Sequence, residues 1–270
     1  MVNTIRCASD TDLLASAAPC YLKGKRRPAA ARVTVCPQIG RWSDYLQAGT
    51  ARDVFRHEML HALGYGTIMS AAAEAVAPHD QTLLWRTGQR VQPFVRRFMD
   101  LAGPATEFVR AHFNCSSIAG VEAEESSKKH LSEYMFGNEL MTPSISPSAN
   151  YFTEISARIL EATHLADKPW YSVNRSVIAR ETAAYSYGLG WGCTFALGSC
   201  VDYIDERIRN GKTTFPFCSA TDYMERRPQL KVCTRTPTLQ FPHPRRFSYA
   251  CDHTSMGGEE AASGIQKLFR

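Results

Sequence analysis

Apolar and polar residues alternate or recur along the chain with periods that predict a small number of strands and helices. Residues Ala31–Pro37 alternate between the two classes and lie between Pro28 and Pro37, so they predict a strand. Apolar residues recur at helical spacing in further segments, namely 51–63, 91–101, 105–113 and 150–163. From Tyr185 onward Gly, Cys, Pro and aromatic residues dominate, which predicts a loop-rich, disulfide-stapled C-terminal region.

These elements divide the chain into three expected parts of an α+β protein. Residues 1–64 carry the predicted strand and end with the first predicted helix. Residues 65–192 form a mixed central part, and residues 193–270 form a Cys-rich C-terminal part. The sequence contains no internal repeat and no low-complexity segment.

The composition is that of a globular protein. Of the 270 residues, 44% are hydrophobic and 21% are charged, which excludes disordered, collagen-like and coiled-coil chains. The net charge is +5, and basic residues gather only at 23–27, so no nucleic acid partner is expected. No apolar stretch approaches the roughly 18 residues that a membrane span needs.

The nine cysteines are scattered and include no CxxC pair, which excludes zinc ribbons and thioredoxin-like sites. Scattered cysteines in a chain of this size are typical of disulfide-bonded proteins from an oxidising compartment. Glycosylation sequons at Asn114 and Asn174 favour the same compartment. We expect one disulfide between Cys20 and Cys36. We expect at least two more within the group of Cys193, Cys200, Cys218, Cys233 and Cys251.

The first residues do not fit a secreted protein. Asp10 and Asp12 precede a short apolar run at 13–18, which makes a poor signal peptide. The chain is therefore expected either to be cytosolic with reduced thiols or to be a fragment without its true N-terminus.

The sequence His57-Glu-Met-Leu-His61 is the main candidate for chemistry. We predict that it lies on a helix that begins at Thr50 as N-cap, with Asp53 three residues on, and ends at Gly64. His57 and His61 then lie one turn apart on the same face. The opposite face is predicted to carry an apolar stripe of Phe55, Met59, Ala62 and Leu63.

Two imidazoles at this spacing reach one Zn²⁺ at about 2.0–2.1 Å. Glu58 projects about 100° around the helix from His57, where it meets a water on the metal without being a ligand. A catalytic zinc site needs a third protein ligand, and the short metzincin pattern places it at Thr67, which excludes that pattern. Spacing alone does not choose among the other histidines downstream, which are His79, His112, His130, His164, His243 and His253.

Several stretches of the chain resemble the leishmanolysin family of zinc metalloproteases. The segment His57–Gly64 resembles the active-site helix of that family. The family inserts a long segment before its third histidine and follows that histidine with a Met-turn of the form E-L-M-x-P. Glu139–Pro143 has this form, and His130 stands at a suitable interval before it. Further similar stretches, within a resemblance from about Cys20 to Cys251, are 111–122, 151–152 and 191–195.

The resemblance implies a metzincin-like zincin that hydrolyses internal peptide bonds. It implies one Zn²⁺ per chain, held by His57, His61 and His130, with Glu58 as the general base. It further implies that Gly64 lets the chain turn sharply after the helix and that Met141 forms an apolar floor under the metal.

The resemblance also implies a setting, with protein or peptide substrates, a cell-surface or secreted location, and a link to cell adhesion. The signal peptide and pro-segment of the family do not precede Met1, so a partial or truncated copy is expected. Membrane association would then need a lipid anchor or segments absent from this chain. One alternative is a catalytically inactive surface or adhesion protein that keeps the fold, against which the intact Glu58 argues. A second alternative is an intracellular zincin with reduced thiols.

Overall fold

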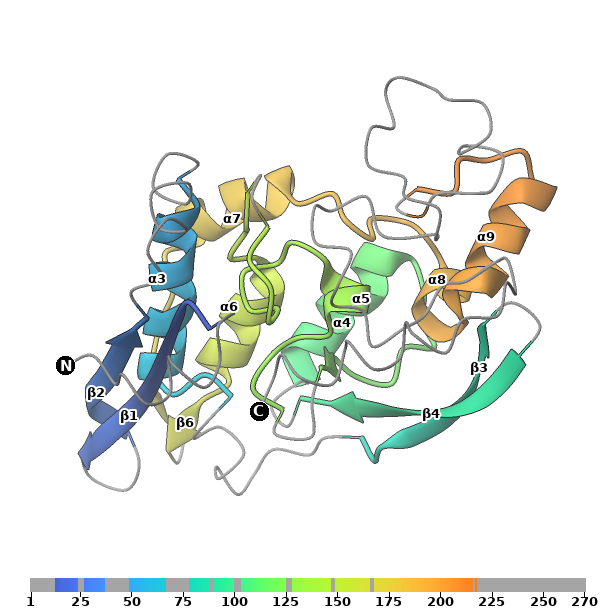
Figure 1. Cartoon of the computed structure of the whole chain (residues 1–270). Coiled ribbons are helices and arrows are strands. Elements are labelled where there is room, and N and C mark those ends of the chain that lie inside the picture. The colour runs from blue at the N-terminus through green and yellow to red at the C-terminus, as the bar shows by residue number, and fades with distance from the viewer. Residues whose placement is uncertain are drawn as a thin grey trace.

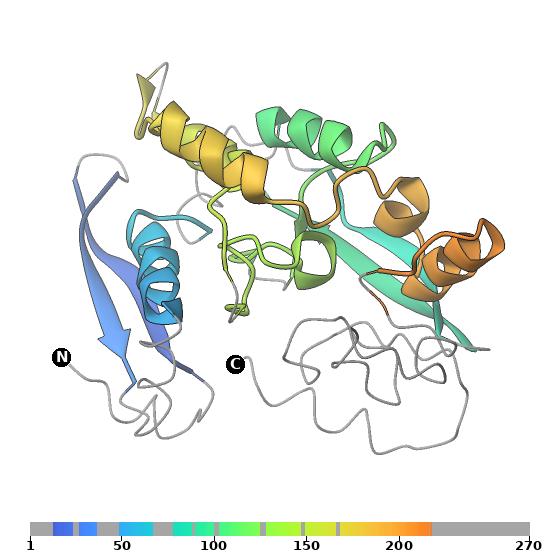
Figure 2. The same ribbon diagram turned by 90° about the horizontal axis from the view of Figure 1, so that it is seen from above.

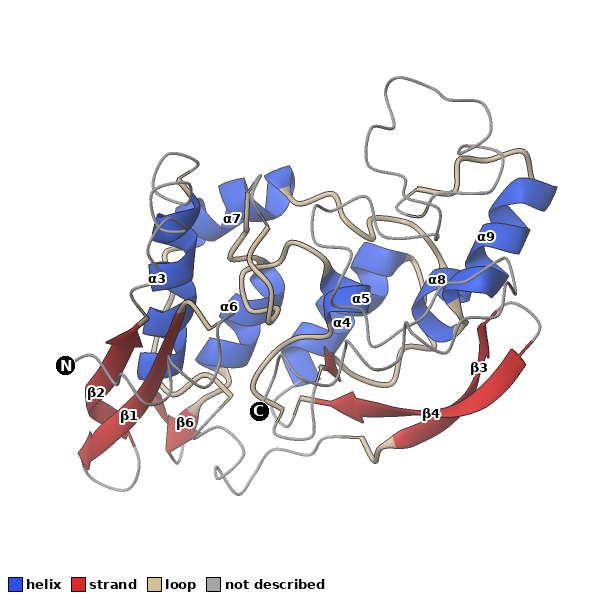
Figure 3. Ribbon diagram, in the orientation of Figure 1, coloured by secondary structure: helices blue, strands red, loops and turns tan. Residues whose placement is uncertain are grey.

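The computed structural model describes residues 13–23, 27–36, 49–66, 78–87, 90–99, 103–124, 128–146, 149–165, 168–215 and 217. Two long β-hairpins lie at opposite ends of the described part, and most of the helices lie between them (Figures 1 and 3). The expected mixture of helices and strands is therefore confirmed. The division at residues 64 and 192 stays a prediction.

The first hairpin pairs β1 (Ala15–Lys23) with β2 (Arg27–Val35) in antiparallel register. The predicted strand at 31–37 is confirmed as the second half of β2, and β1 takes up the apolar run at 13–18. Ala15 pairs with Val35 at one end of the hairpin, and Lys23 pairs with Arg27 at the other. The hairpin packs against helix α3 (Thr50–Ala62), as Figure 2 shows.

Helix α3 confirms the predicted helix at 51–63, but its N-terminus differs from the prediction. Gly49 is the N-cap residue, and Thr50 is already helical, so no side chain caps the helix. Asp53 instead accepts hydrogen bonds from the backbone and side-chain N–H groups of Asn150, both at 3.3 Å, and pairs with Arg56 at 3.2 Å. The carboxylate is thus engaged by another segment of the chain.

The predicted apolar stripe on α3 is only half right, because Ala62 is buried and Leu63 packs against the core but the other two residues do not. Phe55 and Met59 are 44% and 53% exposed, whereas His57, Glu58 and His61 are buried. The reason is that α3 lies between the β1–β2 hairpin and the loops that follow residue 136, so that its polar face is covered (Figure 2). Backbone carbonyl groups of Leu140 and Tyr65 bond to His57 and His61 on this face, which lowers the usual cost of burying the two rings.

The second hairpin pairs β3 (Gln81–Thr87) with β4 (Arg90–Phe98), and the short β5 (Glu122–Ala123) pairs with the end of β4. The predicted helix at 91–101 is therefore wrong. Phe94, Arg96 and Phe98 point inward with a period of two, as in a strand, and exposed Val95 points outward. Arg96 is buried and donates a hydrogen bond to Glu122 at 2.7 Å, which joins β4 to β5.

The central helices surround the main hydrophobic core. Helix α4 (Gly103–Phe113) confirms the prediction at 105–113, and α6 (Glu154–Glu161) confirms the one at 150–163 in shorter form, with Thr153 as N-cap. Helices α5 (Glu133–Phe136) and α7 (Arg175–Ala184) and strands β6 (His164–Leu165) and β7 (Lys168–Pro169) complete this part. Large, fully buried rings of the core include Tyr134, Phe113, Phe136, Phe195, Tyr203 and Phe217.

The region after Tyr185 contains more helix than the sequence predicts. Helices α8 (Cys193–Leu197) and α9 (Cys200–Arg209) occupy a stretch that was expected to be mostly loop. Ser199 and Asp202 form a capping box that starts α9, and Val201, Tyr203 and Ile204 are buried while Ile208 is exposed. The rest of the predicted loop region, 218–270, lies outside the described residues.

One disulfide is described in full, and it joins the end of α4 to the start of α8. Its partners are Cys115 and Cys193, with a Cα–Cα distance of 4.9 Å. Cys36 and Cys200 are also disulfide-bonded. Cys20 is a free, exposed thiol, so the predicted bond between Cys20 and Cys36 is wrong.

The hairpin register explains this error. The backbone N–H of Cys36 donates a hydrogen bond to the carbonyl oxygen of Leu14 at one end of the hairpin, while Cys20 lies toward the other end. Cys193 pairs with Cys115, outside the group in which its partner was expected. Cys218, Cys233 and Cys251 lie outside the described residues, so bonds within the rest of the group stay a prediction.

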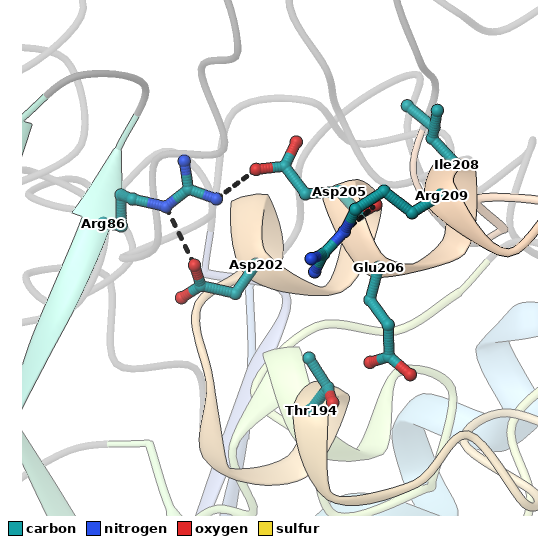
Figure 4. Close-up of a pocket in the computed structure, with 7 residues that line it drawn as sticks. All are labelled: Arg86, Thr194, Asp202, Asp205, Glu206, Ile208 and Arg209. Atoms are coloured by element: carbon teal, nitrogen blue, oxygen red, sulfur yellow. Dashed lines mark hydrogen bonds and ion pairs between the residues drawn. The ribbon is translucent and has the colours of Figure 1, made fainter.

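A polar cavity of about 770 Å³ lies between β3 and α9 (Figure 4). Nε of Arg86 donates to Asp202 at 2.8 Å, and the same guanidinium pairs with Asp205. These ion pairs fasten α9 to β3 at the end of the molecule opposite to α3 (Figure 1). No helix in the described part of the chain is both long and apolar enough to cross a membrane.

Candidate metal centre

Three histidines meet between α3 and the segment that precedes α5. His57 and His61 are one turn apart on α3, and their Nε2 atoms are 3.0 Å apart. Nε2 of His130 lies 3.1 Å from Nε2 of His61. One ring nitrogen from each residue lies within 4.8 Å of the other two, which is the arrangement that a single metal ion requires.

The other candidate histidines are placed elsewhere. His112 lies on α4, where its Nε2 is 2.7 Å from the carbonyl oxygen of Tyr187, in the core. His79 precedes β3 and is exposed, and His164 belongs to β6. His243 and His253 lie outside the described residues. Within the described part of the chain, only the group of His57, His61 and His130 could hold a metal ion.

Backbone carbonyl groups orient two of the three rings. Nδ1 of His57 lies 2.7 Å from the carbonyl oxygen of Leu140, and Nδ1 of His61 lies 3.0 Å from that of Tyr65. A carbonyl oxygen only accepts, so each Nδ1 carries the proton and each Nε2 presents its lone pair. Metal-ligating histidines commonly make this kind of second hydrogen bond. These two carbonyl groups belong to the backbone, so the residue types give no signal for them.

The lone pairs of the histidine nitrogens indicate that a cation fits between the three rings. Two Nε2 lone pairs that face each other at 3.0 Å repel unless a cation lies between them. Burial, together with His61 and His130, lowers the pKa of His57 well below its ordinary value, so this ring stays neutral. Three imidazole nitrogens form a donor set that suits Zn²⁺.

Glu58 lies on the same helix with its carboxylate buried. Burial raises the pKa of Glu58 to about 7, and a hydrogen bond from the backbone of Ala17 in β1 opposes this effect. Its Oε2 atom is buried and has no hydrogen-bond partner within the described structure. A buried, unsatisfied carboxylate oxygen next to a metal-binding group suits a water molecule that is activated there.

The segment Glu139–Pro143 connects the histidines from different parts of the chain. Met141 is fully buried, and its carbonyl oxygen accepts a hydrogen bond from the backbone of Leu131, next to His130, at 2.9 Å. The preceding residue, Leu140, accepts from His57. The turn at Leu140 and Met141 therefore bonds both to His57 and to the neighbour of His130, two histidines that are far apart in sequence.

Two glycines shape the chain after α3. Gly64 has φ +100°, and its backbone N–H donates to His61 at 2.9 Å, so the helix ends there as predicted. Gly66 has φ +71°, and a Cβ atom at this position would lie 2.5 Å from the Cα of Lys129. Gly66 therefore lets the end of α3 approach the residue before His130. Gly66 was not among the predicted site residues, although it stands two positions after Gly64.

Replacing Gly66 by Ala is expected to weaken metal binding. The left-handed backbone costs a non-glycine residue about 1–2 kcal/mol, and the added methyl group would also push Lys129 and His130 away from α3. Competition with a chelator would measure the metal affinity. Gly211→Ala is the matched control, since Gly211 has φ +61° but no atom within 4 Å of the added Cβ. Equal metal affinity in the two variants would contradict the role given to Gly66.

Comparisons with known proteins agree with this geometry. The sequence model described as leishmanolysin matches residues 2–264. The leishmanolysin-like peptidase of Drosophila melanogaster is 28% identical over 229 residues, which cover 72% of this chain and 32% of the fly protein. The leishmanolysin-like peptidase of Caenorhabditis elegans is 24% identical over 230 residues, which cover 72% and 33%. The chain thus spans about a third of the length of these curated relatives. Because the family match covers nearly all of its 270 residues, the chain belongs to the leishmanolysin family, a family of metalloproteases.

Proposed function

We propose that the protein is a zinc metalloendopeptidase. One Zn²⁺ per chain would be held by His57, His61 and His130, and Glu58 would be the general base. The observation that carries the proposal is the convergence of three Nε2 atoms beside a buried carboxylate oxygen that has no partner in the described structure. Family membership supports the same reaction class.

The chemistry divides between the metal and the side chains. Zn²⁺, when bound, supplies a Lewis acid that lowers the pKa of water toward about 7 and polarises the scissile carbonyl group. Glu58 Oε2 accepts the proton of the attacking water while the water oxygen bonds to the carbonyl carbon. The same carboxyl group then gives this proton to the leaving amine as the C–N bond breaks. Its buried position keeps competing water away from the proton.

The helix and the Met-turn perform the positioning. His57 and His61 are held by the carbonyl groups of Leu140 and Tyr65, so their rings need little rearrangement to bind a metal. Met141 would form the apolar surface beneath the site, and Gly64 would end the helix so that the chain can turn toward His130. Such preorganisation lowers the cost of reaching the transition state.

The proposed substrates are proteins or peptides, and the proposed location is the cell surface or the outside of the cell. The disulfide between Cys115 and Cys193 supports an oxidising compartment. Both sequon residues, Asn114 and Asn174, are exposed. A role in cell adhesion and a membrane attachment through a lipid anchor or through segments outside this chain stay predictions of the family resemblance.

The test is proteolysis by the full chain, produced in an oxidising secretory host, with metal content measured on the same sample. We expect about one zinc per chain, cleavage of casein or of a peptide library, loss of cleavage on chelation, and its recovery with added Zn²⁺. A folded protein that holds one zinc and cleaves no member of a broad library would contradict the protease proposal. That result would support the alternative of an inactive surface protein that keeps the fold.

A further inference from the structure

The Met-turn contains a buried carboxylate that the proposed reaction does not use. Glu139 is fully buried. Its Oε2 accepts a hydrogen bond from the backbone N–H of Met141 at 2.6 Å, and its Oε1 accepts from the backbone and the hydroxyl group of Thr153, both at 3.1 Å. These partners are all donors, so the charged carboxylate is the form that this setting satisfies.

The bond to Met141 leads directly to the histidine group. The N–H of Met141 and the C=O of Leu140 belong to one planar peptide group. The carbonyl oxygen of this group accepts the hydrogen bond from Nδ1 of His57 at 2.7 Å. A continuous chain of hydrogen bonds therefore runs from the Glu139 carboxylate, through one peptide group, to the ring of His57. Successive bonds in such a chain polarise one another.

We propose that Glu139 is a positioning residue for the metal centre. It holds the peptide group between Leu140 and Met141 in place, which orients the ring of His57 and strengthens its Nε2 atom as a metal ligand. The inference rests on the proposed function, in which this Nε2 atom is a metal ligand. In many zinc sites a carboxylate bonds a ligand histidine directly. Here the peptide group stands between the two and transmits the effect of the charge.

A second connection from Glu139 reaches the other helical histidine. The side chain of Ser156 hydrogen-bonds to Glu139 and lies 3.2 Å from the hydroxyl group of Tyr65. The carbonyl oxygen of Tyr65 accepts from Nδ1 of His61. Burial raises the pKa of Glu139 to about 7, and its hydrogen-bond donors, Ser156 among them, oppose this effect. One buried group thus supports the surroundings of both histidines.

The test compares zinc affinities of the full chain by competition with a chelator. Glu139→Gln keeps the shape but removes the charge, and its amide group would place donors against donors of Met141 or Thr153. We expect Zn²⁺ to bind about 10–100-fold more weakly, as when other indirect partners of zinc ligands are removed. In the metal-free protein, the NMR signal of the Nδ1 proton of His57 is expected to move upfield, because its hydrogen bond weakens.

Glu122→Gln is the matched control, because Glu122 is also a buried carboxylate but is paired with Arg96 in the second hairpin. We expect this variant to lose stability and to keep the zinc affinity and the Nδ1 proton signal of the parent. Parent affinity in Glu139→Gln, or an equal loss in Glu122→Gln, would overturn the inference.

If Glu139→Gln does not fold, Glu139→Asp provides the test. Its carboxylate is set back by about 1.5 Å, so it cannot keep its bonds to both Met141 and Thr153. A smaller loss of zinc affinity is then expected, and an unchanged affinity would overturn the inference. A parent protein that binds no zinc would instead contradict the proposed function, and the Nδ1 proton signal would still test the hydrogen-bond chain by itself.

Discussion

Replacing Glu58 by Gln is expected to abolish most peptide cleavage while zinc stays bound. The change keeps the shape of the side chain and one acceptor oxygen but removes the group that takes the proton. General base catalysis contributes about 10²–10⁴-fold, so kcat should fall by that factor. The parent and the variant should hold equal amounts of zinc, because the three histidine Nε2 atoms are unchanged. Peptide cleavage rates and metal analysis on the same samples check both statements.

The surroundings of Glu58 support its role as the general base. Among the described residues, Glu58 is the one with a buried side-chain oxygen, Oε2, that has no hydrogen-bond partner. The backbone of Ala17 in β1 donates a hydrogen bond to the same carboxylate. Glu107, which is exposed on α4 and pairs with Arg110, serves as a control, and Glu107→Gln should cleave like the parent. If Glu58→Gln cleaves as fast as the parent, the role given to Glu58 is wrong even though the family assignment stands.

Local patterns predicted the elements whose neighbours in sequence decide their structure. The strand at the end of β2 and helices α3, α4 and α6 follow from alternation or from helical spacing. The segment that became β4 shows the limit of this reasoning. Its residues Val91, Phe94, Val95 and Phe98 stand at the spacing of a helix, but they also fit a strand. The pairing with β3, which no local pattern reveals, decides between the two.

The face of α3 that is buried could not be predicted from hydrophobicity. Its polar face is covered because it carries a site whose partners come from distant segments, so Phe55 and Met59 stay exposed. The hydrogen-bond partners of the histidines were missed for another reason. They are the carbonyl groups of Leu140 and Tyr65, which are backbone atoms and leave no signal in the residue types.

His130 was predicted from the family resemblance and not from spacing in the sequence. Spacing within the sequence left several histidines open, and only the resemblance to a family with a distant third histidine and a Met-turn selected this one. The structure places His130 beside His61 through two backbone contacts, one from Glu124 to the carbonyl of His130 and one from Leu131 to Met141. These contacts depend on the folded chain, so the sequence alone could not supply them.

Replacing His130 by Ala is expected to remove zinc and with it the zinc-dependent part of the stability. A bound ligand at 100 times its Kd stabilises a protein by about 2.7 kcal/mol, and this contribution should disappear from the thermal unfolding curve in zinc. Zinc affinity should fall by more than the roughly 10–100-fold typical of indirect partners, since a direct ligand is lost. In the presence of a chelator, the variant should show no loss of stability relative to the parent. The variant should be as stable as the parent or more stable, because the close approach of the Nε2 atoms of His61 and His130 at 3.1 Å is relieved.

His112→Ala separates this pattern from ordinary destabilisation. His112 is a buried histidine of α4 that stacks on Tyr185 and lies 2.7 Å from the carbonyl oxygen of Tyr187, away from the three converging rings. Its loss should lower the unfolding temperature by the same amount with zinc and with chelator, and the zinc content should stay at one per chain. Unfolding temperatures of the parent and both variants, each recorded in zinc and in chelator, make the comparison. A His130→Ala variant that keeps one tightly bound zinc would show that the third ligand is a different residue.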